Sequence, residues 1–387
     1  MPSTERPRVL FYVQHLLGIG HLRRASLIAQ AMAAENLEVH VVLGGTPTME
    51  IGWDGATVHQ LPPLTAMDSA FSGLVDPHGT PPNEAYWRTR REALISTADA
   101  LKPAALLIEL YPFGRRPFRQ ELLPLLDRVV SLHPRPRVYC SLRDILVDKD
   151  RPNRDRETVE TVERFFDRIL VHGDADFVSL GATFPLADTL AERIVYTGYV
   201  AGPPPEPSEA GRGDVIVAAG GGAVGGDLLL TALAARPLSA LSDRKWRLLT
   251  GPNLDPAVAE TLNAARSGNI IVEPNRADYP ALLANAAVSI SQGGYNTVMD
   301  IIQAKCPAVI VPFAEGGESE QTYRAGILAD RGYLSMLGSE KLSPTDLANA
   351  IDSAVNRRRP PGPPFALDGA SRTARFIVEK ITDDSAK

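Results

Sequence analysis

The sequence predicts an α/β protein made of two doubly wound domains of the Rossmann type. Short runs of Val, Ile and Leu alternate with stretches of helical periodicity along most of the chain. The runs are continuously apolar, as in parallel sheets that are covered on both faces. The pattern stops at a segment rich in Pro and Gly and then begins again, and 387 residues are enough for about two domains.

The first half opens on the apolar run Arg8–Val13, which we interpret as a buried strand. Leu22, Ala25, Ala29 and Met32 follow at helical spacing. Further strands are predicted at residues 39–43, 105–110, 138–142, 169–172 and 194–199. Residues 62–87 are rich in Pro, Gly and Ser and are predicted to form a long loop.

The second half repeats this pattern after a break in composition. Residues 201–214, AGPPPEPSEAGRGD, have little to bury and are predicted to be a linker between a domain at 1–200 and one at 215–365. Ser343, with Asp346 three residues later, is a predicted helix N-cap. The last segment, 366–387, is expected to form a helix that returns to the first domain. The strands of the second domain are predicted at residues 215–218, 246–249, 270–272, 287–291 and 308–311.

Composition excludes several classes of protein. A net charge of −6 and a pI near 5.7 give no positive field for a polyphosphate, so we expect no nucleic-acid partner. Cys140 and Cys306 lie in separate apolar runs and are predicted core residues, so neither a disulfide framework nor a thiolate metal site is indicated. No apolar stretch reaches membrane-spanning length. We expect a cytoplasmic protein, either free or peripheral at the inner face of a membrane.

The stretch QHLLGIGHLRRA follows the first strand and places two histidines and two arginines in and after a turn. Gly18 and Gly20 allow a tight turn, and His21 stands at the predicted start of the helix. Parallel-sheet domains bind ligands at the carboxyl ends of their strands, so His21 is expected to face the cleft between the domains and to accept a proton there. The alternative is that it caps the helix or packs. His15 follows shortly after the same strand. It is either a second residue that contacts the ligand or a structural residue of the core.

Two glycine-rich turns in the second half suit an anion. AAGGGAVGGD contains Gly220, Gly221 and Gly222 between a strand and a helix, and SQGGYNTVMD repeats this arrangement. Backbone N–H groups at such turns approach an anion closely, and no P-loop Gly-Lys-Ser/Thr follows. Two such turns indicate a diphosphate. Downstream, Glu320 and Gln321 supply an acceptor and an amide suited to hydroxyl-rich ligands.

Basic residues follow two further strands of the first half. Glu109, Arg115 and Arg116 lie in IELYPFGRRPFR, and Arg143 lies in SLRDILVDK. These side chains are candidates to bind an acceptor, whose carboxylate or phosphate the arginines would hold; the alternative is a solvated helix start with salt bridges. The Asp-x-Asp sequence of HGDADF, at residues 174–176, follows a first-half strand and is interpreted as a turn and not as a metal site.

The sequence SQGGYNTVMDIIQAKCPAVIVPF resembles the C-terminal domain of glycosyltransferase family 28, and GIGHLRRA resembles that family's glycine-rich opening. The resemblance implies the GT-B fold, two Rossmann-like domains that face each other across a cleft. It makes His21 a candidate general base, with Gly18 and Gly20 beside the donor phosphates. The donor-binding residues that it implies are Gly220, Gly221, Gly222, Ser291, Gly293, Gly294, Asn296 and Thr297 for the phosphates, Asp300 for the ribose, and Glu320 and Gln321 for the sugar hydroxyls.

The resemblance implies an inverting, metal-independent glycosyltransferase that uses no cofactor and moves a sugar from a nucleotide-sugar donor, a UDP-sugar such as UDP-N-acetylglucosamine, to an acceptor hydroxyl. The acceptor class stays open among a small molecule, a glycan and a lipid-linked sugar. Three other functions share the fold: a sugar-nucleotide hydrolase, a non-hydrolysing sugar-nucleotide epimerase, and a nucleotide-sugar sensor without activity.

Overall fold

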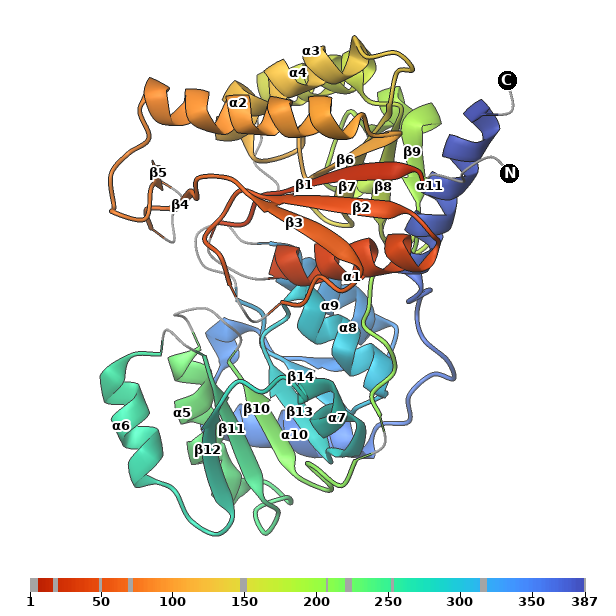
Figure 1. Cartoon of the computed structure of the whole chain (residues 1–387). Helices are drawn as coiled ribbons and strands as arrows, with labels where there is room; N and C mark the ends of the chain where they lie inside the picture. Colours follow the sequence, from red (N-terminus) through yellow and green to blue (C-terminus); the bar gives the residue numbers. More distant parts are fainter. Residues whose placement is uncertain are drawn as a thin grey trace. The chain divides into compact units, whose positions relative to one another are not determined.

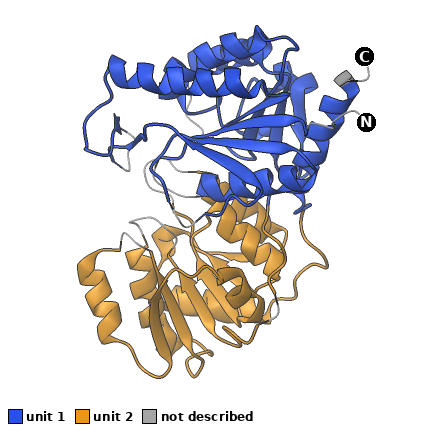
Figure 2. Ribbon diagram, in the orientation of Figure 1, with its two compact units in different colours: residues 1–200, 366–387 blue, residues 201–365 orange. Residues whose placement is uncertain are grey.

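The computed structural model divides into two compact units (Figure 1, Figure 2). Unit 1 comprises residues 1–200 and 366–387, and unit 2 comprises residues 201–365. The predicted linker, 201–214, is grouped with unit 2. The structure describes residues 6–16, 20–48, 51–68, 72–146, 152–206, 208–219, 225–251, 254–313 and 319–385.

A parallel sheet in the order β3-β2-β1-β6-β7-β8-β9 forms the centre of unit 1. Short strands β4 (Thr65–Ala66) and β5 (Leu74–Val75) pair separately. The sheet strands are β1 (Arg8–Val13), β2 (Glu38–Leu43), β3 (Ala56–Gln60), β6 (Ala105–Glu109), β7 (Arg137–Arg143), β8 (Arg168–His172) and β9 (Ile194–Tyr196). The α-helices are α1 (Gly20–Ala34), α2 (Glu84–Leu101), α3 (Arg119–Val130), α4 (Pro152–Phe165) and α11 (Gly369–Ser385).

Helices cover both faces of this sheet, which is why its strands are apolar without interruption. Alternate residues of β1 enter two cores: Phe11 packs with α1 and α11, whereas Leu10 and Tyr12 pack with α2 and α3. Figure 1 shows α1 on one side of the sheet and α2, α3 and α4 on the other. Ala374 and Ile377 of the last helix are buried in the core that α1 lines, so this helix completes unit 1.

Unit 2 contains a parallel sheet in the order β12-β11-β10-β13-β14-β15. Val215 and Val217 of β10 face one core with α5 and α10, and Ile216 faces the other with Leu282 of α7. The elements are β10 (Val215–Ala218), α5 (Gly226–Ala235), β11 (Trp246–Thr250), α6 (Pro256–Ala264), β12 (Ile270–Pro274), α7 (Tyr279–Asn285), β13 (Val288–Ser291), α8 (Tyr295–Ala304), β14 (Ala308–Ile310), α9 (Glu320–Asp330), β15 (Ser335–Met336) and α10 (Pro344–Asn356).

Most of the predicted strands are confirmed, and the differences have simple causes. The short or half-exposed strands β3 and β15 carry no continuous apolar run and escaped prediction. The long loop predicted at residues 62–87 is wrong at its end: Asn83 caps α2 by accepting from the backbone N–H of Tyr86, and Trp87 is buried in the core.

Three local predictions are confirmed. The Ser343 hydroxyl accepts a hydrogen bond from the Asp346 backbone N–H at the start of α10. Cys140 and Cys306 are buried. Asp174 accepts from the backbone N–H of Asp176 in a turn after β8, so the Asp174 carboxylate stabilises the turn.

Each sheet has one place where the strand order reverses. In unit 1 the reversal lies between β1 and β6, and in unit 2 it lies between β10 and β13. The connections that leave two such neighbouring strands run to opposite faces of the sheet, which opens a crevice at their carboxyl ends. The segments that follow β1, β6 and β13 are therefore the places to look for binding residues.

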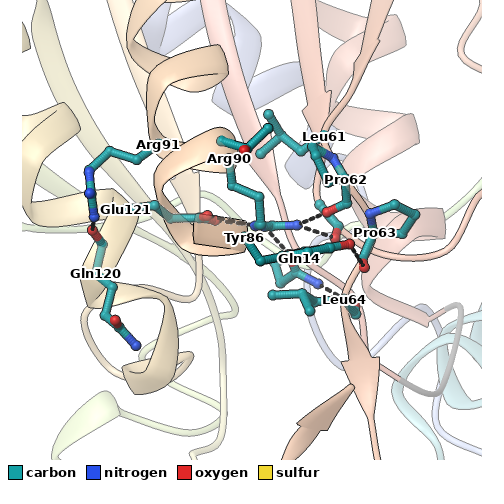
Figure 3. Close-up of polar contacts among 12 residues, drawn as sticks. Gln14, Leu61, Pro62, Pro63, Leu64, Tyr86, Arg90, Arg91, Gln120 and Glu121 are labelled. Atoms are coloured by element: carbon teal, nitrogen blue, oxygen red, sulfur yellow. Dashed lines mark hydrogen bonds and ion pairs between the residues drawn. The ribbon is translucent and has the colours of Figure 1, made fainter. Parts of the chain in front are cut away.

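A buried guanidinium fixes the backbone at the carboxyl end of β1 (Figure 3). Arg90 of α2 makes a bidentate ion pair with Glu121 of α3, at 2.7 Å from Nε and 2.7 Å from Nη2, and neither side chain is exposed. Arg90 also donates to Gln14 Oε1 at 3.1 Å and to the carbonyl oxygens of Gly44 and Pro62. One side chain thus connects two helices with the ends of β1 and β2.

Gln14 passes this constraint on to the neighbouring backbone. Its amide nitrogen donates to the carbonyl oxygens of His15 at 2.7 Å and Leu64 at 3.1 Å. Gly44 leaves the room that this contact needs, since a Cβ there would lie 2.0 Å from Gln14 Oε1. The backbone that leads from β1 into the following turn is therefore held on both sides.

Replacing Glu121 with Ala is expected to lower the free energy of unfolding of unit 1 by about 3–5 kcal/mol, because Arg90 is left as an uncompensated buried charge. Replacing Glu84, whose exposed carboxylate pairs with Arg91, is expected to cost less than about 1 kcal/mol. Urea denaturation combined with hydrogen exchange of the unit 1 strands measures both. Equal losses in the two variants would contradict the assigned role of the buried pair.

Candidate functional site

The predicted base, His21, lies in the first turn of α1 and contacts the end of β6. Its Nδ1 is 2.6 Å from Oε1 of Glu109, the last residue of that strand. Arg24, one helical turn later, donates to the same carboxylate oxygen at 2.6 Å. Because β1 and β6 are neighbours at the reversal of strand order, this contact spans the crevice of unit 1. The His21 side chain is 22% exposed and that of Glu109 is 1% exposed.

These contacts define the tautomer of His21. Burial by itself raises the pKa of Glu109, but His21, Arg24 and Arg115 outweigh it and lower the pKa to about 2, so the carboxylate is ionised and can only accept. Nδ1 also lies 3.2 Å from Arg24 Nη2, but its contact with the carboxylate is the shorter one, so we assign the proton to Nδ1, which donates to Glu109. Burial is the main cause that lowers the pKa of His21 to about 4, against the opposing charge of Glu109. At neutral pH the ring is uncharged, and Nε2 carries the lone pair that can take a proton.

A second histidine, which the sequence did not single out, joins the ends of other strands of the same sheet. His172 ends β8, and its Nε2 lies 2.7 Å from the Ser141 hydroxyl while its Nδ1 lies 2.9 Å from that of Thr197. Burial lowers the pKa of His172 to about 3, so this ring is neutral as well. All three side chains are buried, and their contacts tie β7 and β8 to the segment after β9.

The residues that the sequence assigned to the acceptor separate into three groups. Glu109 contacts His21 and Arg24 inside the unit, which is the geometry of a residue that orients the base. Arg116 forms an ion pair with Glu157 of α4. Arg115 and Arg143 are half-buried near Glu109: burial and the charge of Arg143 are among the causes that lower the pKa of Arg115.

His15, the open case of the sequence analysis, is buried at the end of β1. Burial and the charge of Arg115 lower its pKa, so it is uncharged at neutral pH. A Cβ on Gly45 would lie 2.4 Å from the His15 ring, which shows how closely the two segments approach. This packing favours the structural reading of His15.

In unit 2 the predicted donor turn connects β13 to α8. Gly293 is packed: a Cβ there would lie 3.2 Å from Ile310 Cγ2 and 3.2 Å from Gln321 Cβ. Gly294 is the N-cap of α8, and among the described residues only Thr297 Oγ1 comes within 4.0 Å of a Cβ built on it. The helix N-terminus behind Gly294 is thus approachable by an anion, whereas the preceding residue is fixed by packing.

Gln321 holds this turn from the start of α9. Its Oε1 accepts hydrogen bonds from the backbone N–H of Gly293 at 2.8 Å and of Phe313 at 3.1 Å, so it joins the segments after β13 and β14. The neighbouring Glu320 is buried and pairs with Arg324 at 2.7 Å. The carbonyl oxygen of Gln321 and Oε1 of Glu320 are therefore engaged within the unit.

The remaining donor predictions lie at different depths. Asn296 and Thr297 are half-buried in the first turn of α8. Ser291 and Asp300 are buried, the first at the end of β13 and the second inside α8. Gly20 begins α1. Gly18 and the turn that contains Gly220, Gly221 and Gly222 lie outside the described residues.

Within the described residues, no helix is long and apolar enough to span a membrane. The described side chains also include no group of three or more His, Cys, Asp or Glu residues arranged to bind a metal ion.

Unit 2 matches a known protein family. Residues 215–363 match the family model of the glycosyltransferase family 28 C-terminal domain. Over 106 residues the chain is 31% identical to the UDP-N-acetylglucosamine--N-acetylmuramyl-(pentapeptide) pyrophosphoryl-undecaprenol N-acetylglucosamine transferase of Brucella anthropi, a match that covers 27% of each chain. The protein of the same name from Exiguobacterium sp. is 29% identical over 100 residues, 26% of this chain and 28% of that protein. The match spans about a quarter of the length of these relatives.

Solved structures resemble the whole chain. The calicheamicin glycosyltransferase CalG4 matches with a TM-score of 0.61 at 15% identity, over 99% of this chain and 98% of its own. MurG of Acinetobacter baumannii matches with a TM-score of 0.60 at 15% identity, over 96% and 99%. These likenesses and the two parallel sheets confirm the predicted GT-B fold class.

The neutral His21 makes the stability of unit 1 depend on pH. Its pKa falls from the ordinary 6.5 to about 4 on folding, so between these values the unfolded chain binds more protons and stability is lost as the pH falls. We expect His21 to contribute a slope of about 1.4 kcal/mol per pH unit in this window. Urea denaturation at several pH values should show a shallower slope for His21→Asn. An exposed control, His78→Asn, should keep the wild-type slope, and a His21→Asn slope equal to the wild-type slope would contradict the assignment.

Proposed function

We propose that this chain, in which residues 215–363 form a glycosyltransferase family 28 C-terminal domain, transfers a sugar from a UDP-sugar to an acceptor hydroxyl. The observation that carries the proposal is this family domain, together with the approachable N-terminus of α8 that it contains. The named relatives transfer N-acetylglucosamine from UDP-N-acetylglucosamine, which makes that sugar nucleotide the first donor to test.

Unit 2 is proposed to bind the donor. The N–H groups at the start of α8, beyond Gly294, would hold the diphosphate, with Asn296 and Thr297 beside it. Gln321 supports this site by fixing the backbone of Gly293, and Asp300 is the candidate for the ribose. Backbone amides and a helix N-terminus stabilise the charge on the departing nucleoside diphosphate without a metal ion, so we expect activity to persist in a metal chelator.

Unit 1 is proposed to supply the base. His21 would take the proton of the acceptor hydroxyl on Nε2 while the oxygen attacks the anomeric carbon, which inverts its configuration. Glu109 orients the ring through Nδ1 and stabilises the positive charge that develops on it, and Arg24 holds Glu109 in place. Water in the place of the acceptor would give hydrolysis with the same residues. The acceptor is proposed to be a small molecule, a glycan or a lipid-linked sugar.

Substitutions at two adjacent glycines test donor binding and folding separately. Gly294→Ala is expected to leave the melting temperature of unit 2 nearly unchanged but to weaken UDP binding at least tenfold, since the methyl group covers the helix N-terminus. Gly293→Ala is expected to cost about 1–3 kcal/mol of stability by overpacking against Ile310. Calorimetry with UDP and thermal unfolding measure the pair. Wild-type UDP affinity in Gly294→Ala would argue against this donor site.

Nucleotide release from UDP-, GDP- and dTDP-sugars tests the whole proposal. The wild type is expected to release UDP slowly from one UDP-sugar, and His21→Asn is expected to lose at least 100-fold of this rate while its donor affinity changes less than twofold. His78→Asn, exposed and remote in sequence, serves as the control. Undiminished release by His21→Asn would remove the base from the mechanism. Failure of the wild type to bind any of these donors would overturn the proposal.

A further inference from the structure

Three guanidinium groups gather at the carboxyl end of the unit 1 sheet. Arg24 comes from α1, Arg115 from the segment after β6, and Arg143 from the end of β7; we call these residues the arginine cluster. Glu109 lies among them, and its pKa responds to Arg24 and Arg115. The single negative charge of Glu109 is therefore shared among several arginines, and Arg24 donates a hydrogen bond to it at 2.6 Å.

Arg115 is paired with no carboxylate among the residues that the structure describes. Its backbone is left-handed, with φ at 58°, at the N-cap of the following short helix. Its Nε is buried and has no hydrogen-bond partner among the described residues. Within that same part of the chain it forms no ion pair, in contrast to Arg116, which pairs with Glu157. A buried guanidinium nitrogen without an acceptor is costly unless a ligand supplies one.

The charge of Arg115 acts on the proposed base. It lowers the pKa of both His15 and His21, the two histidines that follow β1. Burial lowers the pKa of Arg115 itself, and the positive charges of Arg143 and Arg24 act in the same direction against Glu109. The cluster thus holds like charges together beside His21.

The other titratable groups around the cluster have hydrogen-bond partners of their own. His172 is neutral, and the Tyr12 hydroxyl donates to Glu121 on the side of α3. Asp144 accepts a hydrogen bond from the Tyr199 hydroxyl at 2.9 Å. Glu109 is thus shared with Arg24, and the Asp144 carboxylate accepts from Tyr199.

From this arrangement we propose that Arg115 and Arg143 form an anion site that holds a phosphate or carboxylate group of the acceptor beside His21. That the bound anion belongs to an acceptor rests on the proposed function, whereas the anion site itself does not. A planar guanidinium forms paired hydrogen bonds with either anion, and an anion here would relieve the repulsion among the three arginines. It would also place the hydroxyl to be activated within a short distance of a charged anchor.

Calorimetric titration of the whole protein with inorganic phosphate, and separately with acetate, tests the site without donor or turnover. Arg115→Gln and Arg143→Gln are each expected to weaken the binding of the preferred anion at least tenfold. Arg119→Gln is the matched control, because Arg119 lies in the same segment but is exposed and pairs with Glu157 at 3.2 Å; its affinity should stay within twofold of the wild type. The anion that binds more tightly identifies the acceptor group as phosphate or carboxylate.

A site-resolved readout separates this site from the donor turn of unit 2. Bound anion opposes the charge of Arg115 and should raise the pKa of His21 above its value of about 4, which NMR titration of the His21 ring measures. The rise should be absent in Arg115→Gln and present in Arg119→Gln. No anion binding by the wild type, equal binding by Arg115→Gln and Arg119→Gln, or an unchanged His21 would each overturn the anion site. Slow nucleotide release that persists in such a case would leave the proposed function standing.

Discussion

The buried ion pair between Arg90 and Glu121 is the constraint on which the arrangement of unit 1 depends. A buried guanidinium needs hydrogen-bond acceptors for its N–H groups. Arg90 donates to Glu121, to Gln14 and to two backbone carbonyl oxygens. Meeting this need requires α2, α3, β1 and β2 to stand in one relation to each other. The same relation leads the backbone after β1 through Gln14 and His15 toward α1, where the candidate base is found.

The reversal of strand order brings residues from two distant parts of the sequence together beside this fixed backbone. β1 and β6 are neighbours, yet their connections leave on opposite faces, so His21 and Glu109 meet at 2.6 Å although 88 residues separate them in sequence. The pair performs a task that neither residue performs alone: the ionised carboxylate fixes the donor on Nδ1 and leaves Nε2 as an acceptor. In unit 2, Gln321 fixes the turn after β13 at Gly293, and the backbone N–H groups at the start of α8 are the proposed counterpart of this pair.

Periodicity was enough to predict the buried strands and the place of His21, because continuous apolar runs and a helix start are local properties. The pairing of His21 with Glu109 was not predictable in this way, since it depends on which strands are neighbours; the sequence indicated only that Glu109 follows a strand. The Arg90 network escaped for the same reason, and its two charged residues lie inside helices where charge usually marks a solvated face. Trp87 was misplaced because Pro and Gly before it outweighed the helix that Asn83 caps.

The arginine cluster shows why a weak base can be useful at such a site. Burial and two neighbouring guanidinium groups keep His21 neutral, so the ring is always ready to accept a proton but holds it poorly. In the proposed site, an anion at Arg115 would remove part of that penalty and strengthen the base only while the anion is bound. Because the same charge would both anchor a ligand and adjust the imidazole beside it, recognition of an acceptor and activation of its hydroxyl would become one event. Water brings no such charge, and it would therefore meet the weaker form of the base.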